Sequence, residues 1–129
     1  MNDLQLVNPS HFAPPVGPYS QAVRVGSLVF LSGQAAVDEH NNVIAPSDVA
    51  EQRRVTIERI HDVLREVGGT LSDLVTATVF LRDINHFGDY NRAWAEKFGD
   101  HRPARATVRA DLAVDGLLVE IQSIAHLPR

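Results

Sequence analysis

One long segment with a helical hydrophobic repeat constrains the fold of this chain more than any other feature. Its apolar residues recur at three- and four-residue steps, which places them in a single stripe along a helix. The stripe consists of Val49, Ile57, Ile60, Leu64 and Val67. Ser47 or Asp48 is expected to cap the start of this helix. Gly68-Gly69 is expected to end it, because glycine adopts the left-handed backbone conformation at little cost.

Strand-like segments lie on both sides of this helix. Alternating or β-branched runs predict strands at 4–7, 20–25, 28–32, 76–81, 104–109 and 117–125. A second helix is expected over 87–98, where Tyr90, Trp94 and Phe98 recur every four residues. The proline-rich stretch 8–18 predicts a stiff loop. The order β-β-β-α-β-α-β-β predicts an α+β fold, in a single domain over 1–129, with both helices on one face of a mixed sheet.

The composition argues against several classes of protein. The chain has 129 residues, no cysteine and a formal net charge of −4. Without cysteine it has no disulfide framework, no thiolate nucleophile and no Cys-ligated zinc, and its histidines share no metal-binding spacing. The negative charge disfavours general nucleic-acid binding. No secretory signal and no apolar run of membrane length are visible, so a cytoplasmic location is expected.

One acidic residue stands out because it lies inside a strand-like segment. Alternation places Glu120 on one face with Leu118 and Gln122. A carboxylate among apolar neighbours is costly unless it is paired or hydrated. Two interpretations stay open for Glu120: a solvated carboxylate on an exposed sheet face, or a functional acid.

Arg105 is the natural partner for such an acid, because its planar guanidinium matches a carboxylate through two parallel hydrogen bonds. Either it forms a structural ion pair, with Glu120 or another acid, or it anchors an anionic substrate. Tyr19 and Ser32 are hydroxyl residues beside glycine- and proline-containing backbone. No Gly-x-Ser-x-Gly elbow surrounds Ser32, which argues against a serine nucleophile. A capping or surface amide is the simpler explanation of Asn91.

Five short motifs, in register along nearly the whole chain, resemble the RidA/YjgF family of reactive-intermediate imine deaminases, also called endoribonuclease L-PSP proteins. The motifs are residues 15–22, 30–34, 79–83, 103–108 and 119–121. The resemblance implies the chorismate-mutase-like α+β fold and a homotrimer with ligand clefts between subunits. It also implies hydrolysis of 2-imino or enamine acids without a metal or an organic cofactor.

The resemblance also assigns roles to individual residues of this chain. Arg105 would bind the substrate carboxylate, and Glu120 would position the attacking water and accept its proton. The substrate-binding positions fall on Tyr19, Ser32, Asn91 and Thr107. Thr107 stands where many members have cysteine. Because the family uses that position largely through its backbone, catalysis is expected to survive the difference.

The function implied by the resemblance is a hydrolytic deaminase that converts imino acids such as 2-iminopropionate to 2-keto acids and ammonia. Its partners would be these small molecules and further copies of the chain. Two alternatives stay open. One is a trimer that binds 2-keto acids in the same cleft without catalysis. The other is a ribonuclease or RNA-binding protein, which the net charge of −4 disfavours.

Overall fold

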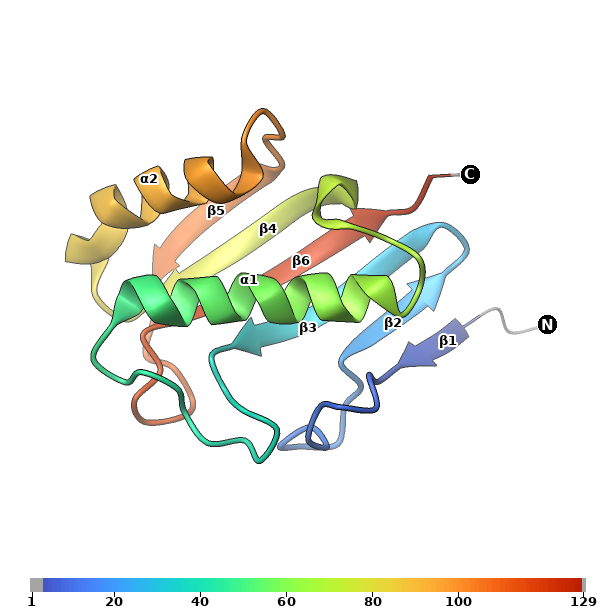
Figure 1. Ribbon diagram of the computed structural model, residues 1–129, viewed down its shortest axis with the longest axis horizontal. Coiled ribbons are helices and arrows are strands. Elements are labelled where there is room, and N and C mark those ends of the chain that lie inside the picture. Colours follow the sequence, from blue (N-terminus) through green and yellow to red (C-terminus); the bar gives the residue numbers. More distant parts are fainter. Residues whose placement is uncertain (1–3, 129) are drawn as a thin grey trace.

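A six-stranded mixed sheet forms the base of the fold, and two helices cover one of its faces (Figure 1). The computed structural model describes residues 4–128. The strands are β1 (Leu4–Val7), β2 (Ala22–Val25), β3 (Leu28–Ala35), β4 (Leu74–Leu81), β5 (Ala104–Arg109) and β6 (Val119–His126). The helices are α1 (Val49–Arg65) and α2 (Phe87–Phe98), with short 3-10 turns at Leu71–Asp73 and Ile84–His86.

The strands lie in the order β1-β2-β3-β6-β4-β5. All neighbouring pairs are antiparallel except β4 and β5, which run parallel and are connected through α2. β6, the last strand of the chain, therefore lies in the interior of the sheet between β3 and β4. β5 forms one edge of the sheet. The predicted α+β class, element order and placement of both helices on one face are confirmed.

The long helix begins and ends where local chemistry dictates. The side chain of Asp48 accepts a hydrogen bond from the backbone N–H of Glu51, which satisfies a free donor of the first turn. After α1, Gly68 has φ +77°, and the N–H of Gly69 donates to the carbonyl of Leu64. The predicted cap and stop signals of this helix are both confirmed.

Two strands are longer than the sequence predicted. β3 continues to Ala35, through a register shift between Leu31 and Gln34. Glycine weakens strand propensity, so Gly33 concealed this continuation, which contains a local bulge. β4 begins at Leu74, directly after a short turn that is closed by a capping box between Thr70 and Asp73.

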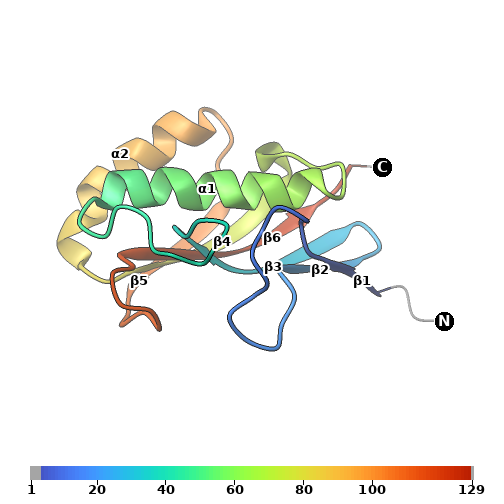
Figure 2. The same ribbon diagram turned by 60° about the horizontal axis from the view of Figure 1, so that its bottom comes forward.

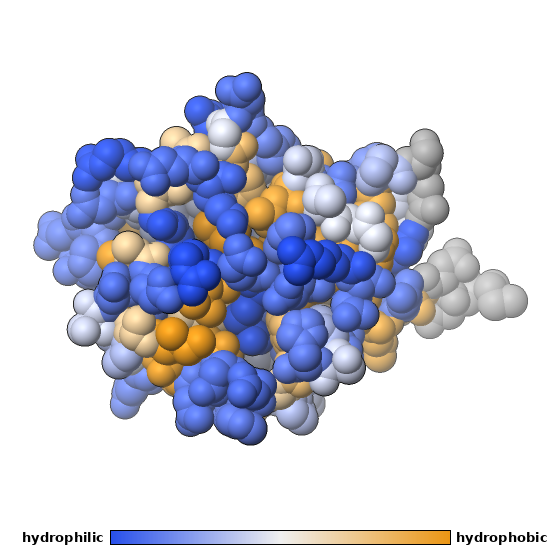
Figure 3. Space-filling view, viewed as in Figure 1, coloured by the Kyte–Doolittle hydropathy of each residue, from blue (hydrophilic) through white to orange (hydrophobic). Residues whose placement is uncertain are grey.

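The core lies between the helices and the sheet. α1 buries Ile57, Ile60, Val63 and Leu64. The sheet contributes Val29, Leu31, Val79, Leu81, Val119 and Ile121 from alternate positions of its strands. The outward surface of α1 is hydrophilic (Figure 3), as expected of an amphipathic helix that packs on a sheet. Within residues 4–128, no helix is both long and apolar enough to cross a bilayer.

In the described part of the chain, no helix covers the opposite face of the sheet, and loops project from it (Figure 2). Apolar side chains nevertheless point outward there: Leu6 is 65% exposed, Phe30 43% and Val108 41%. Val25 and Leu28 extend the same surface. An apolar surface of this extent is typical of a face that packs against another protein surface. We call it the bare face.

Candidate functional site

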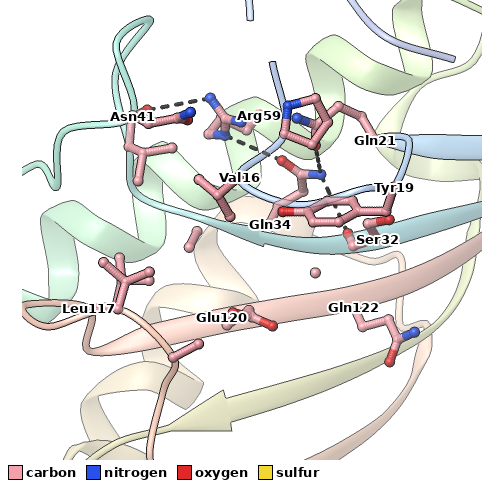
Figure 4. A pocket seen from close by; sticks show the side chains of 16 residues that line it. Val16, Tyr19, Gln21, Ser32, Gln34, Asn41, Arg59, Leu117, Glu120 and Gln122 are labelled. Carbon is pink, nitrogen blue, oxygen red and sulfur yellow. Dashed lines mark hydrogen bonds between the residues drawn. The ribbon is translucent and has the colours of Figure 1, made fainter. Parts of the chain in front are cut away.

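A pocket opens at the edge of the sheet where β3 runs on beyond its partner strand. β2 pairs with β3 only between Leu28 and Leu31, whereas β3 continues to Ala35. The cavity has a volume of about 460 Å³, suited to a small metabolite (Figure 4). Its lining includes Tyr19, Gln21, Ser32, Gln34, Arg59 and Glu120. Among residues 4–128, no three side chains of the usual ligand types are grouped so as to hold a metal ion.

Glu120 brings a carboxylate into this pocket from the interior strand β6. It lies opposite Ala35 and packs directly over Gly33, where an added Cβ would lie only 2.3 Å from the Glu120 Oε2. Burial raises the pKa of Glu120 above its ordinary value. No described residue forms an ion pair with it. An unpaired, half-buried carboxylate of raised pKa suits a general base.

The loop before β2 covers the pocket and is fastened to the fold at several points. The Ser32 hydroxyl donates to the carbonyl of Ser20 at 2.7 Å. Asn41 Nδ2 donates to the carbonyl of Pro14 at 3.0 Å. Tyr19, at the end of this loop, is 47% exposed and lines the cavity. Because its proton is held by a backbone carbonyl, Ser32 is not arranged as a nucleophile.

The wall opposite this covering loop is the segment between β5 and β6. Arg82 Nε donates to the carbonyl of Leu117 at 2.7 Å. Gln52, fully buried on α1, donates to the carbonyl of Gly116 at 2.8 Å and accepts from the N–H of Leu118 at 2.7 Å. These bonds satisfy buried backbone groups, so they fix the wall against which a ligand would pack.

A second polar cluster lies away from this pocket, between β5 and α2. The guanidinium of Arg105 donates to Asn91 Oδ1. Its Cζ lies 5.1 Å from the ring centroid of Trp94 and 5.9 Å from those of Phe87 and Tyr90. No described carboxylate pairs with it. The aromatic rings and the amide hold the guanidinium in place, while its charge remains available to an anion.

Arg105 and Glu120 lie on opposite faces of the sheet. Arg105 is in register with Ala77 on the face covered by the helices, and Thr107 follows on that same face. Glu120 is in register with Phe80 on the bare face, and β4 separates the two strands. Within one chain the pocket thus unites Tyr19, Ser32 and Glu120, but not Arg105, Asn91 or Thr107. The structural ion pair between Arg105 and Glu120 does not form within the chain.

The polar lining residues Gln21, Gln34 and Arg59 are among those that the sequence did not single out. Gln21 and Gln34 stand inside two of the quoted motifs, and the Gln34 amide donates to Gln21 Oε1 at 2.9 Å. Arg59 lies on the polar side of α1, where nothing in the helical pattern separates it from the other charged residues. Only its position over the end of β3 brings it to the cavity.

Comparison with known proteins agrees with this architecture. The family model described as Endoribonuclease L-PSP matches residues 10–127. A RutC family protein of Pyrococcus abyssi is 39% identical over 112 residues, which are 87% of this chain and 88% of the relative. The protein named 3-aminoacrylate deaminase RutC of Acinetobacter baylyi is 36% identical over 123 residues, or 95% and 98% of the two chains.

Two solved structures from E. coli superpose closely on this chain. The YjgF gene product matches with a TM-score of 0.85 at 31% identity and covers 95% of this chain and 98% of its own. TdcF with bound serine matches with a TM-score of 0.86 at 30% identity, over 96% and 99%. This chain therefore belongs to the endoribonuclease L-PSP family, the RidA/YjgF family that its motifs resemble.

Proposed function

We propose that this protein hydrolyses small 2-imino or enamine acids to 2-keto acids and ammonia. The observation that carries the proposal is the unpaired, half-buried carboxylate of Glu120 inside a pocket of metabolite size. The relative from Acinetobacter baylyi, which is named for the deamination of 3-aminoacrylate, supports the same class of chemistry. Imines hydrolyse readily, so positioning and one base supply the required catalysis.

The complete site is proposed to form between subunits of a homotrimer. Glu120 lies on the bare face beside an apolar surface, and Arg105 lies on β5, which has no strand beyond it among residues 4–128. An edge strand of a neighbouring subunit packed against the bare face would bring its Arg105 to this pocket. The substrate carboxylate would then bind Arg105, with Asn91 and Thr107 beside it and Tyr19 and Ser32 opposite.

The reaction consists of addition followed by elimination. The Glu120 carboxylate accepts a proton from water as the water oxygen bonds to the imine carbon, and the C=N electron pair moves to nitrogen. Protonated Glu120 gives this proton to the nitrogen, which yields a carbinolamine and restores the carboxylate. A proton from solvent then converts the amine to an ammonium group. The C–N bond breaks as ammonia leaves with the bonding pair, and the hydroxyl proton passes to solvent as the ketone forms, which replaces the proton supplied. Arg105 keeps the carboxylate fixed throughout, which holds the reacting carbon beside the water.

The direct test couples the protein to an amino acid oxidase that generates the imine in place. Purified protein is expected to accelerate the release of 2-keto acid above the spontaneous rate.

A second candidate function is the binding of small amino or keto acids without turnover. It is favoured by the structure of TdcF of E. coli, which holds serine. Saturable 2-keto acid binding without any acceleration of hydrolysis would establish this second function in place of the first.

The pH dependence of hydrolysis is expected to follow Glu120. The base acts when deprotonated, so kcat/KM rises with pH through the pKa of Glu120, which burial places above 4.5. This acidic limb is expected to be absent from the residual activity of Glu120→Gln. An identical limb in both proteins would assign the titration to another group.

The same raised pKa predicts a stability difference that does not depend on catalysis. Because the folded-state pKa exceeds the unfolded-state value, the stability gained from proton uptake is present below the unfolded pKa. It is lost as the pH rises through the folded pKa. Thermal unfolding is therefore expected to show Glu120→Gln gaining stability relative to the natural protein as the pH increases through this interval. A constant difference in Tm would contradict the burial effect.

The bare face supplies the prediction about assembly. Phe30→Asp places a charge among the exposed apolar side chains without entering the core, since Phe30 is 43% exposed. The variant is expected to elute as a folded monomer, whereas the natural chain elutes at three times that mass. Glu39→Lys, a change in an exposed loop, is the control for altered charge. If Phe30→Asp still forms a trimer of unchanged stability, the bare face is not part of the interface between subunits.

The cellular location stays a prediction. A cytoplasmic protein is expected from the sequence, whereas one relative at 46% identity, Mmf2 of Schizosaccharomyces pombe, is named as mitochondrial. Membership of the family therefore does not determine the compartment.

A further inference from the structure

Arg59 is a half-buried cation that the proposed reaction does not use. It projects from α1 and lies at the boundary of the pocket, and no described carboxylate lies within ion-pair distance of it. Burial lowers the pKa of Arg59, although its charge persists because an isolated guanidinium titrates far above neutrality. A cation removed from water without a counter-ion favours an anionic ligand.

Neutral groups hold this guanidinium in position. Its Nε donates to Gln34 Oε1 at 3.3 Å, and its Nη1 donates to the carbonyl of Val37 at 3.4 Å. Its Cζ lies 3.9 Å from the ring centroid of Phe12. The contacts are long for charge-assisted hydrogen bonds, which are usually about 2.7–2.9 Å. They orient Arg59 but place no formal negative charge against it.

Apart from Glu120, no described acidic residue lines the pocket. Asp62, one turn further along α1, attracts Arg59 but is already paired with His11 and Arg65. Asp62 lines a separate, open hollow that Arg59 also borders, together with Asp38, Glu39 and Glu58. Their exposure to water screens them, so they do not replace a ligand carboxylate inside the pocket.

Within the pocket, Arg59 and Glu120 lie on different walls. In Figure 4, Arg59 lies above the end of β3 and Glu120 below it on β6, with Tyr19 and Gln34 between them. A ligand that reacts beside Glu120 and extends past the end of β3 therefore has a cation at its far end. The Gln34 amide links this region to Gln21 and keeps the path between the walls polar.

We propose that Arg59 binds a second anionic group at the distal end of the substrate, so that imines derived from dicarboxylic amino acids are preferred. This inference rests on the proposed function and refines it by naming the substrate class. Arg105 of the neighbouring subunit binds the carboxylate next to the imine, and Arg59 binds the carboxylate at the end of the side chain. Arg59 thereby determines specificity, whereas Glu120 performs the chemistry.

The test compares two five-carbon imines that differ only in the terminal group, which is a carboxylate in the imine of glutamate and a methyl group in that of norvaline. The ratio of their kcat/KM values is measured for the natural protein and for Arg59→Met, which keeps length and apolar bulk. The control is Arg54→Met, on the same helix but paired with Glu51 outside the pocket. We expect the natural protein to prefer the glutamate imine, and Arg59→Met to lower the ratio about 10- to 100-fold.

Other results would overturn the inference. An equal loss on both imines would make Arg59 a structural residue or the anchor for the common carboxylate. An unchanged ratio would exclude any contact with the distal group. If Arg59→Met does not fold, Arg59→Lys is measured, and a partly retained preference is expected because the charge remains without the planar fork. A folded Arg59→Lys that shows no preference for the glutamate imine over the norvaline imine would also contradict the inference.

A binding measurement separates this inference from the proposed reaction. Calorimetric titration with 2-oxoglutarate and with 2-oxopentanoate requires no turnover. Tighter binding of 2-oxoglutarate, abolished in Arg59→Met and kept in Arg54→Met, supports the distal anion site even if no imine is hydrolysed. Imine hydrolysis together with equal binding of the two keto acids supports the deaminase and overturns the role of Arg59.

Discussion

Arg105→Ala is expected to lower kcat/KM for imine hydrolysis by at least about 100-fold, because the proposed site would lose its bidentate, permanently charged anchor for the substrate carboxylate. Asn91 and the rings of α2 hold the guanidinium in one orientation, so its binding geometry exists before the ligand arrives. Arg105→Lys keeps the charge but not the planar fork, and a loss of about 10-fold or more is expected. The measurement is keto-acid release with enzymatically generated imine.

Arg109→Ala provides the matched control for the anchor. Arg109 lies on the same strand and is exposed at its end, so its removal changes the net charge equally. Thermal unfolding of each variant measures the stability lost with the Asn91 contact, so that this loss can be told apart from the loss of substrate binding. If folded Arg105→Ala is as active as Arg109→Ala, Arg105 does not bind the substrate.

Two inactive variants are expected to restore activity when they share a trimer. If the site takes Arg105 from one subunit and Glu120 from the next, a chain with Arg105→Ala still supplies Glu120. A chain with Glu120→Gln still supplies Arg105. Random 1:1 assembly leaves roughly a quarter of the clefts with both native residues. Co-expression with two different affinity tags, followed by sequential purification, isolates the mixed trimers for assay.

The result distinguishes a shared site from a site within one chain. Mixed trimers that stay as inactive as either parent would show that Arg105 and Glu120 do not act across a subunit boundary. Introducing Phe30→Asp into both chains is expected to abolish the recovery, because it prevents assembly. Recovery that persists in such monomers would exclude the interface as its cause.

The sequence predicted the elements that depend on short-range chemistry. The stripe of α1, its Asp48 cap and the stop at Gly68-Gly69 are all confirmed, because each signal acts within one or two helical turns. Alternation also placed Glu120 and Gln122 correctly on the less buried side of β6. The end of β3 was missed because a glycine and a bulge interrupt the pattern.

The relative position of Arg105 and Glu120 could not be predicted from the sequence. Alternation tells which neighbours share a side of one strand, but not which side of the whole sheet that is. Here β4 pairs with β6 on one edge and β5 on the other, and these pairings place Arg105 and Glu120 on opposite faces. Arg59 was missed for a similar reason: its contact with the cavity depends on how α1 crosses the end of β3.

The unequal lengths of β2 and β3 have a consequence for how such a protein diversifies. The Glu120 carboxylate lies on an interior strand that is paired on both sides, whereas the covering segment 14–20 is attached to its neighbours by a few hydrogen bonds. The proposed base and the cover of the pocket thus reside in parts of the fold that tolerate change very differently. Grafting a foreign covering segment between Ala13 and Ser20 would replace Tyr19 and the cover of the pocket while leaving the strand that carries Glu120 in place.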